Sequence, residues 1–155
     1  MSSGSTDQEV KNVIYDSRKV EEGSLFVCIR GAVVDGHKFV PDVVAKGAKV
    51  LIVEEAVEAP EDVTVILVKD TRYAMAFISA AYFGYPAEKL KTIGITGTKG
   101  KTTTTYMVKS ILENAGYKVG LIGTIEAIIG DKVIPAKNTT PESYVIQEYF
   151  HEMAE

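Results

Sequence analysis

A glycine-rich segment at residues 91–105 constrains the fold of this chain more than any other stretch. Its sequence is Lys-Thr-Ile-Gly-Ile-Thr-Gly-Thr-Lys-Gly-Lys-Thr-Thr-Thr-Thr. Residues 92–96 predict a β-strand, the glycines predict a tight loop, and the residues from Lys101 onward predict the first turn of a helix. A glycine loop that leads into a helix directs backbone N–H groups and the positive helix end at one point. The segment therefore predicts a site for the phosphates of a nucleotide.

The side chains at the start of the predicted helix suit the same chemistry. Lys101 supplies a full positive charge for the phosphates, and the hydroxyl of Thr102 can hold Mg²⁺. Five residues separate Gly94 from Gly100, one more than the strict P-loop pattern has. The alternative is a strand–loop–helix corner in which the glycines serve packing alone. That alternative leaves Lys101 poorly placed at the positive end of a helix, so we favour a variant phosphate loop.

Composition and charge narrow the class of protein. The 155 residues are 46% hydrophobic and 25% charged, as is ordinary for a soluble globular protein. The net charge of −4 argues against a general nucleic-acid partner. The only cysteine, Cys28, excludes an intrachain disulfide and suits a reducing cytosol. No apolar run approaches the roughly 18 residues of a membrane span, so we expect a cytoplasmic protein without a membrane partner.

Strand and helix patterns alternate along the chain, which predicts an α/β fold with mostly parallel pairing and right-handed crossovers. We expect strands at 10–15, 25–29, 49–53, 63–68, 92–96 and 119–122, a hairpin around Gly130-Asp131, and helices at 39–46, 71–83, 101–115 and from 140 onward. Asp70 is the expected N-cap of the second helix, and Gly47 and Gly116 are expected to close the first and third. Residues 87–90 are an expected boundary between two domains, 1–88 and 89–155.

Several residues have a structural interpretation from the sequence alone. We expect two apolar stripes at helical spacing to be buried: Tyr73, Ala76, Phe77 and Ala80, and Val108, Ile111, Leu112 and Ala115. Cys28 is expected to be a small buried hydrophobe, His37 a surface loop residue and His151 an exposed helix residue without a metal partner. Ser17 fits a turn hydroxyl as well as a ligand contact. Thr140, with Pro141 after it, fits a plain helix cap as well as a binding residue.

The segment from Gly97 to Thr104 resembles the ATP loop of the Mur ligase family, whose usual form is Gly-Thr-Asn-Gly-Lys-Thr-Thr. Lys99 stands where Asn is common, and this adds positive charge. Further motifs resemble the same family in the same order: Asp-Ser-Arg at 16–18, Gly-Ser-Leu-Phe-Val at 23–27, Asp-Gly-His at 35–37 with Gly31 and Phe39, Gly-Ala at 47–48, and Asn-Thr-Thr-Pro at 138–141. The resemblance covers the chain from about residue 10 to its end.

The resemblance implies an ATP-dependent, Mg²⁺-requiring ligase of peptidoglycan precursor synthesis. Such an enzyme joins meso-diaminopimelate or L-lysine to UDP-MurNAc-L-Ala-D-Glu through an acyl-phosphate and a tetrahedral intermediate. It also implies a small α/β domain at 1–88 that binds UDP-MurNAc, followed at 89–155 by the start of a P-loop central domain with a mostly parallel sheet.

Residue roles follow by position in the same way. Tyr15 and Ser17 would lie beside the uracil, and the loop Ala32, Val33 and Val34 would close over it. The muramoyl-peptide part of the substrate would contact Asn138, Thr139 and Thr140. The ATP phosphates would contact Gly97, Thr98, Lys99, Gly100, Lys101, Thr102 and Thr103. Lys101 would be the catalytic residue and Thr102 the Mg²⁺ ligand.

Family members continue with a second metal site, an adenine pocket and a domain that selects the amino acid. We therefore expect the 155-residue chain alone to be an inactive fragment of the ligase. Two alternatives stay open. One is a stand-alone module that binds a uridine nucleotide without catalysis. The other is a ligase like folylpolyglutamate synthetase, which shares the ATP loop, although the Asp-Ser-Arg motif at 16–18 argues against it.

Overall fold

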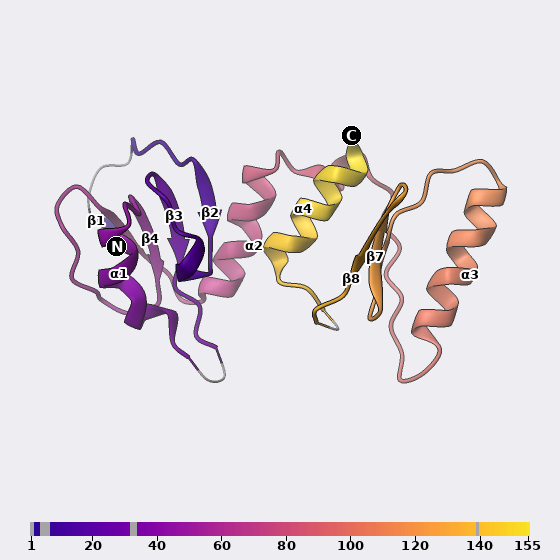
Figure 1. The fold of residues 1–155 in the computed structure, drawn as a ribbon, viewed down its shortest axis with the longest axis horizontal. Coiled ribbons are helices and arrows are strands. Elements are labelled where there is room, and N and C mark those ends of the chain that lie inside the picture. The colour runs from indigo at the N-terminus through magenta and orange to yellow at the C-terminus, as the bar shows by residue number, and fades with distance from the viewer. Residues whose placement is uncertain (1, 4–6, 32–33, 139) are drawn as a thin grey trace. The chain divides into compact units, whose positions relative to one another are not determined.

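The computed structural model describes residues 2–3, 7–31, 34–138 and 140–155. The chain divides into two compact units, Met1–Ile78 and Ser79–Glu155, and Figure 1 shows the elements of each. This division falls inside a helix, whereas the sequence suggested a boundary near residue 88, and the domain limits 1–88 and 89–155 stay a prediction. The fold is α/β, as expected.

Unit 1 is built on a five-stranded sheet with the order β1-β5-β4-β3-β2. The strands are β1 (Ser2–Ser3), β2 (Asn12–Ile14), β3 (Ser24–Val27), β4 (Val50–Val53) and β5 (Thr64–Leu67). Strands β2 to β5 are parallel to their neighbours, and only β1 runs antiparallel, against β5. The parallel sheet is thus confirmed, with every predicted strand of this unit present and slightly shorter than predicted.

The core of unit 1 forms around the two central strands. Every residue of β3 and β4 is buried, which is why both read as continuous apolar runs without alternation. Helix α1 (Val40–Ala45) follows the 3-10 helix η2 (Gly36–Phe39) and contributes Val40 and Val43 to the same cluster as Phe26 and Leu51. Cys28 is buried, as expected, and burial raises the pKa of its thiol to about 12, so it is inert at neutral pH.

Helix α2 (Thr71–Tyr82) begins as predicted but buries a different face. Asp70 Oδ1 accepts a hydrogen bond from the Tyr73 N–H at 2.9 Å, which confirms the N-cap. The predicted core stripe is wrong: Tyr73 is 67% and Phe77 60% exposed. Thr71, Met75 and Ser79 are buried instead. These residues also recur at helical spacing, so periodicity alone did not distinguish the two faces.

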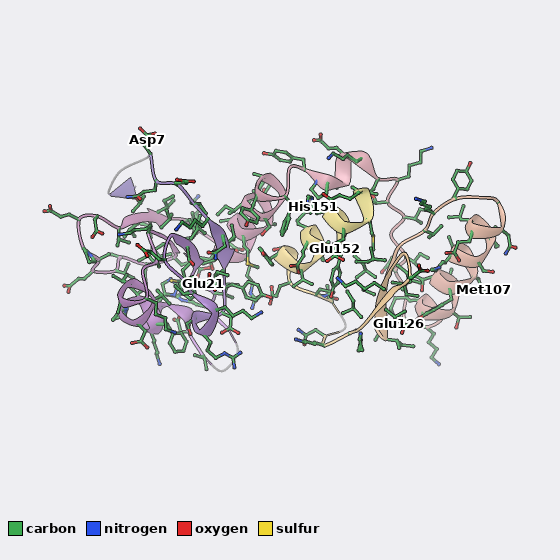
Figure 2. All side chains as sticks on the ribbon, turned by 45° about the horizontal axis from the view of Figure 1, so that its top comes forward. Asp7, Glu21, Met107, Glu126, His151 and Glu152 are labelled. Atoms are coloured by element: carbon green, nitrogen blue, oxygen red, sulfur yellow. The ribbon has the colours of Figure 1, made fainter. Side chains whose placement is uncertain are left out.

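Unit 2 contains the 3-10 helix η3 (Pro86–Lys89), α3 (Lys101–Asn114), the strands β6 (Leu121–Ile122), β7 (Glu126–Ile129) and β8 (Lys132–Pro135), and α4 (Ser143–Ala154). Strands β7 and β8 form the hairpin predicted at Gly130-Asp131. Helix α4 packs on the chain before η3, where the Phe83 ring lies 5.3 Å from that of Tyr144 and 5.5 Å from that of His151. Lys132 of β8 pairs with Glu152 of α4 at 2.8 Å; His151 and Glu152 are labelled in Figure 2.

Two sequence predictions for the strands of unit 2 are wrong in the described chain. Residues 92–96 do not form a strand, and Ile93 is 64% exposed. The strands that are described pair antiparallel rather than parallel. A parallel strand needs hydrogen bonds from a neighbour, and no strand among the described residues pairs with 92–96.

The apolar stripe of α3 is also not buried. No residue of α3 is buried, and Ile111 is 65% exposed. Within the described residues the helix packs mainly on the short strand β6, which is too small to cover the stripe.

The last helix starts later than predicted, at Ser143 with Glu142 as its N-cap. Glu142 has an extended backbone, with ψ of 153°, so the helix cannot include the residues before it. The plain capping role considered for Thr140 is therefore wrong. None of the helices in the described residues combines the length and the apolar character needed to cross a membrane.

The buried positions of the core predict which side-chain substitutions destabilise unit 1. Leu51 is completely buried between β3 and β5, so Leu51→Ala should lower the free energy of unfolding by about 2–5 kcal/mol. Leu67, which is 43% exposed on β5, provides a matched control; Leu67→Ala should cost well under half as much. Urea unfolding followed by circular dichroism measures both, and equal losses would contradict the assignment.

Candidate functional site

The carboxyl ends of the parallel strands bring two predicted binding segments together. Strands β2 and β3 are paired in register, with Ile14 opposite Phe26. Tyr15 and Ser17 directly follow β2, and the turn at 30–35 follows β3. Because parallel strands end at the same edge, both segments lie on the carboxyl edge of the sheet, where open α/β sheets bind ligands.

The Asp-Ser-Arg motif after β2 is a self-contained turn. Asp16 caps the 3-10 helix η1 (Ser17–Lys19) by accepting a hydrogen bond from the Arg18 N–H at 3.1 Å. The Arg18 guanidinium donates to both carboxylate oxygens of Asp16, at 2.9 and 2.7 Å. These bonds lower the pKa of Asp16 to about 2. Lys46 Nζ donates to the Ser17 carbonyl at 2.7 Å, so the turn that carries the half-buried Ser17 is fixed on both sides.

The turn after β3 is closed by backbone bonds. The Gly31 N–H donates to the Val34 carbonyl, and the Gly36 N–H donates to the Ile29 carbonyl, both at 2.9 Å. A Cβ at Gly36 would lie 2.7 Å from the Ile29 nitrogen, so only glycine allows this approach. Val34 is 49% exposed. Of the residues predicted to contact uracil, Ala32 and Val33 lie outside the described residues.

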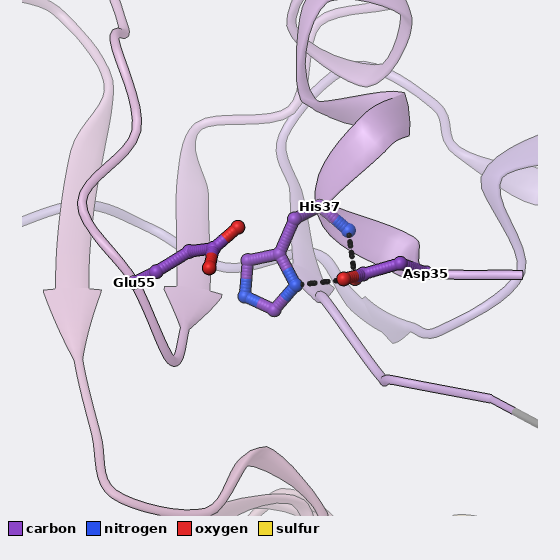
Figure 3. Close-up of side chains that lie close together, drawn as sticks. All are labelled: Asp35, His37 and Glu55. Carbon is purple, nitrogen blue, oxygen red and sulfur yellow. Dashed lines mark hydrogen bonds and ion pairs between the residues drawn. The ribbon is translucent and has the colours of Figure 1, made fainter.

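His37 is buried at 7% exposure, and the expectation of a surface residue is wrong. Its ring Nδ1 lies 2.6 Å from Asp35 Oδ1, and the backbone N–H of Glu54 donates to its Nε2 at 2.9 Å (Figure 3 draws the Asp35 side). A backbone N–H can only donate, so Nε2 accepts and the proton is on Nδ1, which donates to Asp35. The partner Glu54 lies 17 residues further along the chain, so no local pattern indicates this burial.

Around His37 the charged groups form one network. Arg30 Nε lies 3.3 Å from Asp35 and 3.8 Å from Glu54, and its terminal nitrogen bonds Glu55 at 2.5 Å. Glu54 Oε1 accepts from both the N–H and the hydroxyl of Thr71, each at 2.8 Å. The Thr71 N–H lowers the pKa of Glu54, and the His37 N–H lowers that of Asp35. Both carboxylates therefore stay ionised and bonded at neutral pH.

Asp35, His37 and Glu55 lie close enough to suggest a metal site, with ligand atoms within 4.8 Å of one another. Their bonds argue against it. Both ring nitrogens of His37 are engaged, Nε2 as an acceptor and Nδ1 as a donor. Glu55 is bonded to Arg30. The cluster therefore holds the segments together rather than offering free ligand atoms.

The residues of the predicted phosphate loop lie next to one another at the start of α3. Gly100 is the N-cap in a left-handed conformation, with φ of 77°, and no side chain caps the helix. The ATP-loop residues Gly97, Thr98, Lys99, Gly100, Lys101, Thr102 and Thr103 all lie in this loop and first turn. Lys101 Nζ donates to the Gly97 carbonyl at 2.6 Å. The cation and the uncapped N–H groups thus face the same loop, as phosphate binding requires.

One further contact involves the helix that follows this loop. The Tyr106 hydroxyl donates to Glu126 of β7 at 2.5 Å, which raises the pKa of the tyrosine and ties α3 to the hairpin. Figure 2 labels Glu126 on the hairpin and Met107 on α3. Asn138 and Thr140 are exposed in the connection between β8 and α4, and Thr139 lies outside the described residues.

Acid should destabilise unit 1 through the Asp35 network. The ordinary pKa values of Asp35 and Glu54 are 3.8 and 4.5, and both are lowered in the folded chain. A lowered pKa means that the ionised carboxylates stabilise the folded chain. This contribution is complete above the ordinary pKa values and is lost as the pH falls through the lowered pKa values of the folded chain. Asp35→Asn keeps an acceptor for His37 but does not titrate. Its free energy of unfolding should therefore fall less than that of the parent chain between about pH 5 and about pH 3.

Urea unfolding at each pH measures this difference. Asp62→Asn is the control, because Asp62 pairs with Lys49 while its side chain is 66% exposed, where solvent screens the pair. It should change the acid dependence less than Asp35→Asn does, and the opposite order would count against the network.

Comparison with known proteins finds two matching family models. A model described as Mur ligase family, catalytic domain, matches residues 9–83, and a model described as Mur ligase middle domain matches residues 95–155. A UDP-N-acetylmuramoyl-L-alanyl-D-glutamate–2,6-diaminopimelate ligase from Clostridium perfringens is 54% identical over 98% of this chain and 31% of its own length. The ligase of the same name from Clostridium botulinum is 50% identical over 96% of this chain and 31% of its own.

A solved structure of a ligase with this name has a TM-score of 0.74 and 25% identity, over 94% of this chain and 29% of its own. The chain thus spans about a third of the length of the curated relatives it matches. The two family models between them match most of its residues. This chain belongs to the Mur ligase family.

Proposed function

We propose that this chain supplies the UDP-MurNAc-binding part and the ATP-phosphate loop of a MurE-type ligase. Such an enzyme adds a diamino acid to UDP-MurNAc-L-Ala-D-Glu in the cytoplasm, as a step of peptidoglycan precursor synthesis. The name of relatives at 54% and 50% identity supports this activity and favours diaminopimelate over L-lysine as the amino acid. In this proposal residues 1–88 are the UDP-MurNAc-binding domain, and 89–155 belong to the ATP-binding central domain.

The observation that carries the uridine half of the proposal is the parallel register of β2 and β3. It brings Tyr15 and Ser17 to the same sheet edge as the turn that includes Val34. We propose that the uracil lies at this edge, with Ser17 as a hydrogen-bonding partner. Ala32 and Val33 complete the set by resemblance, and Asn138, Thr139 and Thr140 would contact the muramoyl-peptide part.

The ATP half rests on the loop at the start of α3. The reaction joins two anions, because a substrate carboxylate must approach the γ-phosphate of ATP. Lys101 would leave the Gly97 carbonyl, 2.6 Å away, and bind the phosphates together with the uncapped N–H groups of α3. A cation and preorganised N–H groups stabilise the transferring phosphoryl group. The acyl phosphate formed would then be attacked by the amine of the diamino acid, with loss of phosphate.

The residues present also fit a magnesium ion. Thr102 lies beside Lys101 in the first helical turn and is half-buried, and its hydroxyl is the kind of oxygen ligand that Mg²⁺ takes. Mg²⁺ bound there would neutralise charge on the ATP phosphates.

Titration calorimetry with UDP tests the uridine half. Ser17→Ala removes one hydrogen bond of about 1 kcal/mol, so the Kd for UDP should rise about fivefold to tenfold. Ser110→Ala, an exposed serine on α3, is the matched control and should leave the Kd unchanged. ADP should not compete at the uridine site. Absence of heat with any uridine nucleotide would overturn the assignment.

A chimera tests the ligase activity itself. The 155 residues of this chain would replace the matching segment of the Clostridium perfringens relative. The chimera should release ADP only when UDP-MurNAc-L-Ala-D-Glu, ATP and diaminopimelate are all present. Lys101→Ala in the chimera should lower kcat by at least about 100-fold, because the phosphoryl group loses a cation. UDP binding without any ADP release would favour the binding module without catalysis.

A further inference from the structure

We propose that His37 is a positioning residue for the uridine site, acting through Asp35 on the turn that follows β3. The inference rests on the proposed function, because it concerns the pocket in which uracil would bind. His37 would not contact the ligand. It would hold Arg30 and Asp35, the two ends of the turn after β3, at a fixed distance from β4 and so fix the position of Val34.

The first support is that the imidazole is buried and fully bonded. The His37 side chain is 4% exposed, so it is not available to a nucleotide in solvent. Its Nδ1–H donates to Asp35 and its Nε2 accepts from Glu54. Neither nitrogen is left to bind a metal ion or to transfer a proton. A buried ring with both nitrogens paired joins the two segments that pair with it.

The hydrogen bond between His37 and Asp35 helps to hold both ends of the turn. Asp35 Oδ1 accepts from the His37 ring at 2.6 Å and from the His37 backbone N–H at 3.0 Å. Asp35 Oδ2 lies 3.3 Å from Arg30 Nε, and Arg30 and Asp35 form a β-bridge. Arg30 and Asp35 are the two stems of the turn, so fixing Asp35 fixes both.

The hydrogen bond between His37 and Glu54 connects the turn to the central sheet. Glu54 directly follows β4, which is fully buried and paired with both β3 and β5. The carboxylate of Glu54 is itself bonded to Thr71, at the start of α2. The anchor is therefore the edge of the central sheet and a helix start, not a second loop.

The side chains of the turn explain why an anchor is needed. Val34 carries no polar side chain, so any polar contact from Val34 to uracil comes from its backbone. A backbone group cannot adjust by rotating a side chain, and its position depends on the conformation of the turn. If loss of the anchor leaves the binding conformation only about a tenth populated, the Kd rises about tenfold.

The test compares UDP binding to His37→Gln, Asp35→Ala and the double variant by titration calorimetry. Glutamine can still accept from the Glu54 N–H, so His37→Gln breaks the link to Asp35 without leaving that donor unpaired. Each single variant should raise the Kd about tenfold. The double variant should raise it no further than Asp35→Ala alone, because Asp35→Ala already removes the acceptor of the His37 ring together with the ion pair to Arg30. If His37→Gln does not fold, His37→Asn, which keeps the donor toward Asp35 and loses the link to Glu54, takes its place.

Two further measurements separate positioning from plain stability. Val43→Ala removes part of a completely buried side chain from α1, and it should lower Tm while leaving the Kd unchanged. Hydrogen exchange of the Gly31 amide, which bonds the Val34 carbonyl at 2.9 Å, should quicken in His37→Gln and not in Val43→Ala.

The outcomes distinguish the two proposals. If the parent chain does not bind UDP, the proposed function fails and this inference fails with it. If the parent chain binds UDP and His37→Gln binds equally well, the inference alone is overturned. Additive effects of His37→Gln and Asp35→Ala would also overturn it.

Discussion

The parallel pairing of β2 to β5 is the constraint on which the rest of unit 1 depends. Parallel strands must be buried on both faces, and the runs Ser24–Val27 and Val50–Val53 are buried throughout. The same pairing sends every strand end to one edge. The Asp-Ser-Arg turn, the turn after β3 and Glu54 therefore all follow strands at that edge, although they are separated in sequence. The candidate uridine site is a consequence of how the core is built.

The polar side chains at this edge form hydrogen bonds and ion pairs with one another, and these contacts hold the loops of the edge in place. His37 bridges Asp35 and Glu54, Arg30 lies among three carboxylates, and Glu54 caps the start of α2. Such a network rigidifies a loop only when every member is paired. The phosphate loop of unit 2 contrasts with it. There Lys101 bonds a carbonyl of its own loop, and no side chain caps the helix, so its groups are free to exchange that bond for an anion.

Sequence patterns within a few residues predicted most helices and strands. They did not predict features that depend on residues far apart in the sequence. The buried strands, the Asp70 cap and the Gly130-Asp131 hairpin were readable because their causes lie within a few residues. The burial of His37 was not, because its acceptor bond comes from the backbone of Glu54. The face of α2 was misassigned because two stripes share one period. The phosphate loop was predicted from its own residues, whereas the uridine residues came only from the family resemblance.

The central claim is that a uridine nucleotide binds at the carboxyl edge of β2 and β3. Amide chemical shifts of the ¹⁵N-labelled chain, followed during titration with UMP, test it most directly. The account predicts saturable shift changes at Ser17, Arg30 and Val34, with the amides at the start of α3 unaffected because UMP lacks the polyphosphate of ATP. Shift changes confined to unit 2, or none at saturating UMP, would contradict it.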